Sequence, residues 1–369
     1  YQRRFSYQKT FAADPAWAGQ EVLLRFDAAM ANARVLLNGV ELITHADGYT
    51  PFEARLTGQV LAGDNTVTVE IDGSENPEIP PFGGVIDYLT YAGLYREVWL
   101  IVKAPVSIGL HKIETPYVLA AQKSVTVDVA LDNPQGLPLS GSLTATLRDA
   151  AGQDVASTRA TVTGDGLRIE LAGLTGIALW DIQNPALYHL HLDLETPHGR
   201  DATATRFGFR HVAFTAEGFA LNGKPLKLRG LNRHQSFPYV GYALGRAAQE
   251  RDADILKYGL RLNTVRTSHY PQSGYFLDRC DEIGLLVFEE IPGWQHIGGE
   301  KWKAESVENV RRMIRRDWNH PSIFIWGVRI NESQDDHDFY AETNRVARAL
   351  DATRPTGGVR YISESELLE

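Results

Sequence analysis

Short runs of alternating apolar and polar residues fill the first hundred positions, the pattern of β-strands with one buried face. Three clear runs cover residues 21–29, 33–42 and 65–72. Asn38-Gly39 interrupts the second run, and this dipeptide is typical of a tight hairpin turn. A Pro- and Gly-rich segment at 74–84 is too long for a simple turn and predicts an ordered loop. Since no helical period appears, the pattern predicts an all-β domain over residues 1–103.

A second series of short strands follows the apparent linker at 102–109. Runs at 124–133, 141–149, 166–174 and 187–196 are separated by turn residues at the spacing of a β-sandwich. We therefore predict a second all-β domain over residues 104–211. It contains few residues that suggest chemistry, which favours a role as a mechanical spacer.

The periodicity changes at about Val212, where strand-like and helix-like segments begin to alternate. Predicted strands cover residues 226–234, 262–269, 285–293, 323–328 and 356–362, with predicted helices at 247–259, 275–284, 305–320 and 338–352. This alternation predicts a parallel sheet, either doubly wound or part of a (β/α)8 barrel. No G-x-G-x-x-G or G-x-x-x-x-G-K-[ST] motif follows a strand, so a nucleotide-binding fold has little support.

Composition and charge narrow the class of protein. The 369 residues are 43% hydrophobic and 22% charged, which is enough core material for two or three globular domains. The net charge of -9 argues against a nucleic-acid partner, because such proteins present basic faces to phosphates. No stretch approaches about 20 apolar residues, so we expect no membrane span. Cys280 is the single cysteine, which excludes an internal disulfide, and its apolar helical setting predicts burial.

The ends of the chain leave location and assembly open. The chain begins at Tyr1 without a Met or a signal segment and stops in what looks like the start of a new element. We expect a soluble protein of the bacterial cytoplasm or periplasm. The number of subunits cannot be read from one chain, so homo-oligomerisation is also left open.

Polar side chains gather where four successive predicted strands end. They are Asn232, Arg233 and His234 after the first strand, Arg266 and His269 after the second, Glu289 and Glu290 after the third, and Asn331 and Glu332 after the fourth. In barrel enzymes the active site lies at the carboxyl ends of the strands and takes residues from several of them. This distribution favours the barrel and predicts an active site at that face.

These motifs resemble those of one enzyme family. "GLNRHQ", "NTVRTSHYP", "DEIGLLVFEE" and "NHPSIFIW…NES" follow one another as in the barrel of glycoside hydrolase family 2, which includes β-galactosidases, β-glucuronidases and β-mannosidases. "LNGVELITHADGYTPFEARLT" and "YAGLYREVWL" resemble its sugar-binding jelly roll, and "TRFGFR" resembles the close of its immunoglobulin-like domain. The resemblance covers essentially the whole chain.

The resemblance implies a fold and a function. The fold would be a jelly-roll β-sandwich at 1–103, an immunoglobulin-like β-sandwich at 104–211, and the amino-terminal part of a TIM barrel at 212–369, with about five of its eight strands. The function would be that of a retaining exo-β-glycosidase acting on carbohydrates with terminal β-linked sugars, most similar to β-galactosidases. β-Glucuronidase and β-mannosidase specificities are alternatives.

The resemblance also assigns roles to strand-end residues. Glu332 matches the general acid/base, which must hold a proton to give to the leaving oxygen. Asn331 would donate a hydrogen bond to the sugar 2-hydroxyl, and Arg266 would brace the nucleophile. A structural ion pair is the alternative for Glu332, with a strand-end arginine as its partner. The same alternative applies to Arg266, with Glu289 or Glu290 as its partner.

Four further residues are predicted to bind substrate. His234 and His269 match histidines that contact the sugar in the galactosidase branch, with a packing role as the alternative for each. Asp87 matches a jelly-roll loop position that reaches the pocket, with ordering of that loop as the alternative. Trp294 stands where the magnesium-dependent β-galactosidases have a Glu ligand. An indole cannot ligate a hard cation, and His296 alone does not make a magnesium site, so we expect no metal and no other cofactor. Trp294 is instead predicted to form an aromatic wall for a sugar ring, with core packing as the alternative.

A retaining glycosidase also needs a nucleophile about 5–5.5 Å from the acid/base. In the family this is a Glu on a later barrel strand, and neither Glu364 nor Glu366 matches its position. We therefore expect the chain to be an inactive fragment of a longer enzyme. Two alternatives stay open: an inverting glycosidase that uses Glu290 with Glu332, and a carbohydrate-binding protein without catalysis.

Overall fold

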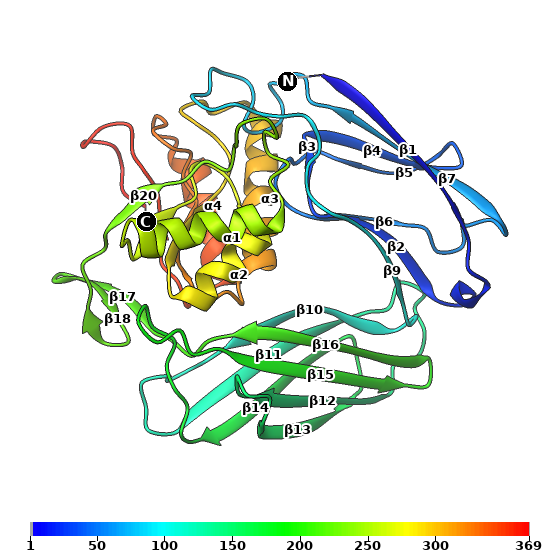
Figure 1. Ribbon diagram of the computed structural model, residues 1–369, viewed down its shortest axis with the longest axis horizontal. Helices are drawn as coiled ribbons and strands as arrows, with labels where there is room; N and C mark the ends of the chain where they lie inside the picture. The colour runs from blue at the N-terminus through cyan, green and yellow to red at the C-terminus, as the bar shows by residue number, and fades with distance from the viewer. Residues whose placement is uncertain (1–2, 369) are drawn as a thin grey trace.

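The computed structural model describes residues 3–368, which form two β-sandwiches and an α/β body in chain order (Figure 1). In the first sandwich the main sheets have the strand orders β1-β7-β4-β5 and β6-β2-β9, and β3 pairs with β8. Its elements are β1 (Arg4–Ala12), η1 (Pro15–Trp17), β2 (Glu21–Phe26), β3 (Ala29–Met30), β4 (Asn32–Leu37), β5 (Val40–His45), β6 (Phe52–Arg55), β7 (Asp64–Asp72), β8 (Gly93–Leu94) and β9 (Val98–Lys103). Alternate apolar residues such as Val35, Val67 and Val69 form its core.

The predicted hairpin turn is confirmed. Leu37 and Val40 face each other across antiparallel strands β4 and β5. Asn38 and Gly39 between them have φ values of 51° and 83°. Positive φ at both central residues is the geometry whose twist matches that of the flanking strands, which explains why Asn-Gly stands here.

The second sandwich packs a sheet of order β10-β11-β14 on one of order β13-β12-β15-β16. Its strands are β10 (Ser107–Glu114), β11 (Lys123–Asp132), β12 (Gly141–Arg148), β13 (Asp154–Val162), β14 (Gly166–Leu174), β15 (Tyr188–Thr196) and β16 (Gly199–Phe207). Its core is built from inward-facing residues of both sheets, including Val127, Leu143 and Leu192. This alternation within each strand is what the sequence predicted.

The third body begins with a small antiparallel sheet of β17 (Val212–Thr215), β18 (Gly218–Leu221) and β19 (Lys224–Pro225). A parallel sheet follows with β20 (Gly230–Asn232), β21 (Thr264–Arg266), β22 (Leu286–Glu290), β23 (Ile323–Gly327) and β24 (Thr356–Gly357). The helices are α1 (Arg246–Asp254), which continues as the π-helix η2 (Ile255–Gly259), α2 (Gly274–Ile283), α3 (Glu300–Asp317) and α4 (His337–Leu350).

The order of this parallel sheet distinguishes the two predicted α/β folds. Its five strands lie side by side in chain order, from β20 to β24. A doubly wound sheet would reverse direction at a switch point, whereas a barrel adds each strand beside the last. The sheet is therefore a partial barrel, as predicted. Cys280 on α2 is fully buried in the core beside this sheet, and burial raises the pKa of its thiol.

The two sandwiches hold the partial barrel at different places. In the second sandwich, Arg210 donates hydrogen bonds to the carbonyl oxygens of Pro321 (2.9 Å) and Ile323 (2.8 Å), at the start of β23. In the first domain, the loop after β7 lies against α3, because Trp302 Nε1 donates to the Phe82 oxygen at 2.9 Å. The first domain therefore reaches the barrel with the loop that carries Asp87. Among residues 3–368, no helix combines the length and the apolar character that a membrane crossing needs.

Candidate active site

The carboxyl ends of three neighbouring strands carry one polar network. Arg266 closes β21, and its Nε donates to Oε2 of Glu290 at the end of β22 (2.8 Å). Nη2 of the same guanidinium donates to Oδ1 of Asn331, in the loop after β23 (2.6 Å). Nδ1 of His269 lies 2.6 Å from Oε1 of Glu290. Since parallel strands end at the same edge, residues 65 positions apart in the sequence meet here.

Glu290 is the centre of this network. Its side chain is only 1% exposed, and each carboxylate oxygen is within hydrogen-bond distance of a nitrogen. Arg266 is therefore paired with Glu290, which is one of the two structural pairings weighed as alternatives for it. The neighbouring Glu289 lies on the other face of β22, as strand alternation requires. It accepts a hydrogen bond from Arg316 on α3 at 3.1 Å, and burial raises its pKa well above the ordinary value.

Arg266 orients the side chain of Asn331. A guanidinium has donors and no acceptor, so the atom of Asn331 that faces it must be the oxygen. The amide nitrogen Nδ2 is then the free end of this residue, which has 4% of its surface exposed. Asn331 thus presents a donor, which is what a hydrogen bond to a sugar hydroxyl would require.

Glu332 lies beside this network in an unusual backbone conformation. Its φ of 52° is in the left-handed region, which costs a non-glycine residue about 1–2 kcal/mol. Its backbone nitrogen donates to the Val359 oxygen at 2.9 Å, after β24. Its Oε2 accepts from Nε2 of Gln295 at 3.4 Å. The fold therefore fixes the Glu332 backbone while its half-buried carboxyl has only a long, neutral contact.

Gln295 is a site residue that the sequence reasoning missed. It belongs to the loop after β22, where its nitrogen donates to the Asn331 oxygen at 2.8 Å. The preceding Trp294 forms an isolated parallel bridge with Asn331. The loop after the third strand is thus paired to the loop after the fourth. Because Asn331 precedes Glu332, this bridge places the backbone of the half-buried Trp294 beside the predicted acid/base.

Two histidines and a tyrosine form an aromatic side of the site. The rings of His234 and His269 are 5.5 Å apart and nearly perpendicular. Tyr88, from the first domain, lies 5.5 Å from His234 and 5.9 Å from His269. Burial lowers the pKa of His234 and nearby His269 acts in the same direction, while the charge of Asp87 opposes them. His234 is therefore neutral at pH 7, with one ring nitrogen as donor and the other as acceptor.

The seven predicted site residues therefore differ in how closely they meet. Arg266, His269 and Asn331 share one network, and Glu332 follows Asn331 directly. His234 joins through ring contacts. Asp87 is exposed and reaches the site through its neighbour Tyr88. Tyr88 could have been found from the sequence only by knowing that the loop at 73–92 lies over the barrel.

Two places bear on whether the described residues could hold a metal. His296 is the remaining part of the magnesium pattern, and it packs between the first domain and α3. Its ring lies so close to Gly83 that a side chain at that position would lie 2.5 Å from Nε2, and it lies 5.8 Å from the ring of Trp302 on α3. Elsewhere, Asp278, Asp281 and His320 have ligand atoms within 4.8 Å of one another.

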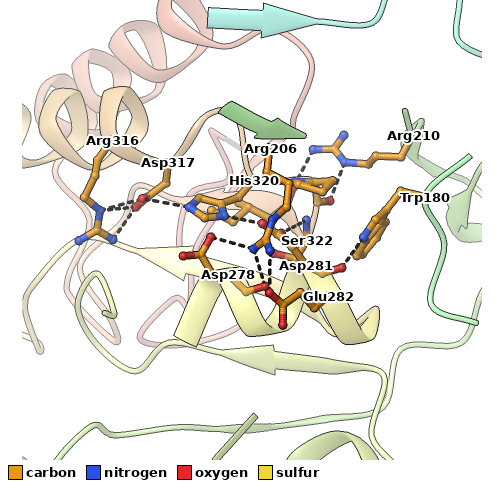
Figure 2. Close-up of polar contacts among 12 residues, drawn as sticks. Trp180, Arg206, Arg210, Asp278, Asp281, Glu282, Arg316, Asp317, His320 and Ser322 are labelled. Atoms are coloured by element: carbon orange, nitrogen blue, oxygen red, sulfur yellow. Dashed lines mark hydrogen bonds and ion pairs between the residues drawn. The ribbon is translucent and has the colours of Figure 1, made fainter. Parts of the chain in front are cut away.

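That second cluster is an ion-pair network (Figure 2). Arg206 from the second sandwich pairs with Asp278 at 2.9 Å. Burial opposes the protonation of His320, but the charge and hydrogen bond of Asp281 outweigh it and raise its pKa to about 9. An imidazolium has no lone pair for a metal, so these residues do not fit a metal site at neutral pH.

Three consecutive family models match this chain. They are the sugar binding domain of glycosyl hydrolases family 2 at residues 1–105, a central glycosyl hydrolases family 2 domain at 109–210, and the family 2 TIM barrel domain at 212–367. The chain therefore belongs to glycosyl hydrolases family 2, and the resemblance read from the sequence is confirmed.

Particular relatives place the chain within this family. It is 52% identical to a β-galactosidase of Rhizobium meliloti, with 100% of this chain and 49% of that protein covered. It is 46% identical to a β-galactosidase of Thermoanaerobacterium thermosulfurigenes, with 100% and 52% covered. Among solved structures, a β-glucuronidase of Parabacteroides merdae superposes with a TM-score of 0.89 at 28% identity, covering 97% of this chain and 48% of that one. The chain spans about half the length of the curated relatives it matches.

Proposed function

We propose that this chain is part of a retaining exo-β-glycosidase of the β-galactosidase type, with Glu332 as the general acid/base. One observation carries the assignment. Among the carboxyls of Glu289, Glu290 and Glu332, that of Glu289 is paired with Arg316 and that of Glu290 with Arg266 and His269. Glu332 has no cationic partner among the described residues and contacts only the neutral Gln295 amide. A proton donor needs this freedom, because a cation beside it would hold the ionised form.

The neighbouring residues support the same chemistry. Asn331, turned by Arg266, offers an amide donor to the sugar 2-hydroxyl, a contact that strengthens in an oxocarbenium-like transition state. His234 and His269 offer ring nitrogens for other hydroxyls, and Tyr88 supplies an aromatic surface. The nucleophile would be a Glu that lies outside residues 1–369, and Arg266 remains our candidate to brace it.

The substrate class rests on the relatives. Those at 44–52% identity are named β-galactosidases, whereas relatives named β-glucuronidases are 28–31% identical. A glucuronide would also need a cation for its carboxylate. At the described strand ends, Arg233 is paired with Asp252 and Arg266 with Glu290, so neither arginine lacks a carboxylate partner. We therefore favour a neutral β-galactoside. A bacterial cytoplasmic or periplasmic location and homo-oligomerisation remain predictions.

The inverting alternative is less well supported. It requires Glu290 to hold a water molecule as general base. Glu290 is 1% exposed, and both its oxygens are engaged by Arg266 and His269. A base that is shared by two cationic or proton-donating groups is a poor acceptor for a proton from water.

The test is the stereochemistry of hydrolysis by the protein expressed from the complete gene. Aryl β-galactoside, β-glucuronide and β-mannoside are compared, and the first-formed sugar is followed by proton NMR before mutarotation. We expect the galactoside to react fastest and to give β-galactose first. If α-galactose forms first, the pair of Glu290 and Glu332 replaces our assignment. Sugar binding without hydrolysis of any of the three would favour the non-catalytic alternative.

A further inference from the structure

A cavity of about 720 Å³ lies where the three bodies of the chain meet, away from the candidate active site. Its lining includes Arg25 of the first sandwich, Arg206 and His189 of the second, and Arg312, Arg315 and Arg316 of α3. The residues 318–320 also line it, and they precede β23, whereas Glu332 follows that strand. The cavity therefore lies at the amino-terminal side of the sheet, opposite the end that carries Glu332.

The lining of this junction cavity is rich in positive charge. It contains five arginines and a single acidic residue, Asp278, which is already paired with Arg206 at 2.9 Å. Figure 2 shows this pair together with His320 on Asp281 and Arg316 on Asp317. The acidic partners are thus occupied, and no unpaired carboxylate of the lining would repel an anion.

Among the lining arginines, Arg315 differs in having no carboxylate partner. It is exposed, and within residues 3–368 no carboxylate lies within ion-pair distance of it. Arg315 and Arg316 follow Arg312 by three and four positions, so these three guanidinium groups share one side of α3. Arginines in the last turn also favour the helix dipole. The arginines that approach from the two other domains have carboxylate partners, Arg25 with Asp27 at 2.9 Å and Arg206 with Asp278 at 2.9 Å, so Arg315 is the lining arginine whose charge is not compensated by an ion pair among the described residues.

Two guanidinium groups of the lining also have unused donors. Nε of Arg206 and Nη1 of Arg312 are buried and have no hydrogen-bond partner. Arg312 forms ion pairs with two carboxylates, since its Nη1 lies 3.7 Å from Glu305 and its Nε lies 3.7 Å from Glu308, but both distances are too long for hydrogen bonds. A buried donor without an acceptor is costly, so such groups are normally satisfied by a ligand, a water molecule or an ion. These two donors come from different domains, and both residues line the same cavity.

We propose that this junction cavity binds a small molecule bearing a phosphate group, with Arg315, Arg312 and Arg206 as its principal ligands. Guanidinium groups match phosphate oxygens in both charge and planar geometry. The volume exceeds that of inorganic phosphate, which favours an organic phosphate. Because the ligands come from different domains, occupancy would tie α3 to the second sandwich. His189, whose pKa is lowered by burial and by Arg206, would gain a compensating charge.

Binding is measured by calorimetry and thermal unfolding on the protein from the complete gene, with inorganic phosphate, pyrophosphate and glucose 6-phosphate at constant ionic strength. We expect one site per chain and, at about a hundredfold excess over Kd, a rise in Tm of roughly 2 °C or more. Tighter binding of glucose 6-phosphate than of inorganic phosphate identifies an organic ligand. Equal binding of both identifies the free ion as the source.

Arg315→Gln is the decisive variant, because an exposed side chain without an ion-pair partner can be changed without harm to folding. We expect its Kd to rise at least tenfold. Arg345→Gln on α4, also exposed, is the matched control for loss of one positive charge and should leave Kd unchanged. Equal Kd values for wild type and Arg315→Gln would mean an adventitious ion only and overturn the proposal, as would no binding of any of the three compounds.

Discussion

The ion pair between His320 and Asp281 predicts how stability depends on pH. Nδ1 of His320 lies 2.6 Å from Oδ2 of Asp281, and the Ser322 nitrogen donates to Oδ1 of the same carboxylate at 3.0 Å. The two side chains are 18% and 2% exposed. Burial alone would lower the pKa of His320, but Asp281 raises it to about 9. The perturbation is His320→Gln, which removes the charge.

The magnitude follows from the difference in pKa between the folded and unfolded states. An unfolded histidine titrates near 6.5, and each tenfold gain in proton affinity is worth about 1.4 kcal/mol, so a folded pKa of about 9 gives a contribution of about 3–3.5 kcal/mol. The folded protein binds the proton more tightly than the unfolded chain does. The contribution is therefore fully present below about pH 6.5 and is lost as the pH rises through about 9.

The assay is urea unfolding of wild type and His320→Gln at pH 6, 7.5 and 9.5, followed by tryptophan fluorescence. Trp180 reports locally, because its indole donates to the Asp281 carbonyl at 2.8 Å. The difference in free energy of unfolding between the two proteins should shrink by about 3 kcal/mol from pH 6 to 9.5. His198→Gln, at a partly exposed histidine without a carboxylate partner, is the control and should leave the wild-type pH profile unchanged. A difference that stays constant with pH would refute the charged pair.

Three further predictions concern the site and the chain. Because Trp294 replaces a carboxylate ligand, we expect activity of the complete gene product to survive EDTA, and a loss that magnesium restores would contradict this. Glu290→Gln should lower the free energy of unfolding by about 3–5 kcal/mol, since Arg266 and His269 lose a buried charged partner. Glu364→Gln, at an exposed carboxyl, is the control, and equal Tm values for Glu290→Gln and wild type would contradict the prediction. Residues 1–369 alone should not turn over an aryl β-galactoside, since no described carboxyl matches the nucleophile; steady-state turnover would overturn this.

The sequence was sufficient for those features that depend on local periodicity. Alternation by two marked the strands of both sandwiches, and the switch to strand and helix marked the parallel sheet from β20 to β24. The sequence also predicted that Arg266, His269 and Asn331 lie close together, because parallel strands end at a common edge, and the structure confirms this.

The remaining features depend on which face of a strand points into the barrel and on packing between residues that are far apart in the sequence. The sequence could not choose between Glu289 and Glu290 as the partner of Arg266, because alternation puts them on opposite faces without saying which face is inside. Gln295 enters the site only because its loop pairs with Asn331. The junction cavity joins Arg25 to Arg315, and no local pattern connects residues so far apart.

The central claim is that Glu332 is the general acid/base, and the leaving-group dependence of Glu332→Gln tests it most directly. The variant is compared with wild type on an alkyl β-galactoside, whose leaving group needs a proton, and on a dinitrophenyl β-galactoside, whose leaving group does not. Glu364→Gln, at an exposed carboxyl, is the control for the same chemical change. We predict that kcat/KM for the alkyl substrate falls about 10²–10⁴-fold while formation of the glycosyl-enzyme from the activated substrate is nearly unchanged. Equal losses on both substrates would contradict the assignment of Glu332.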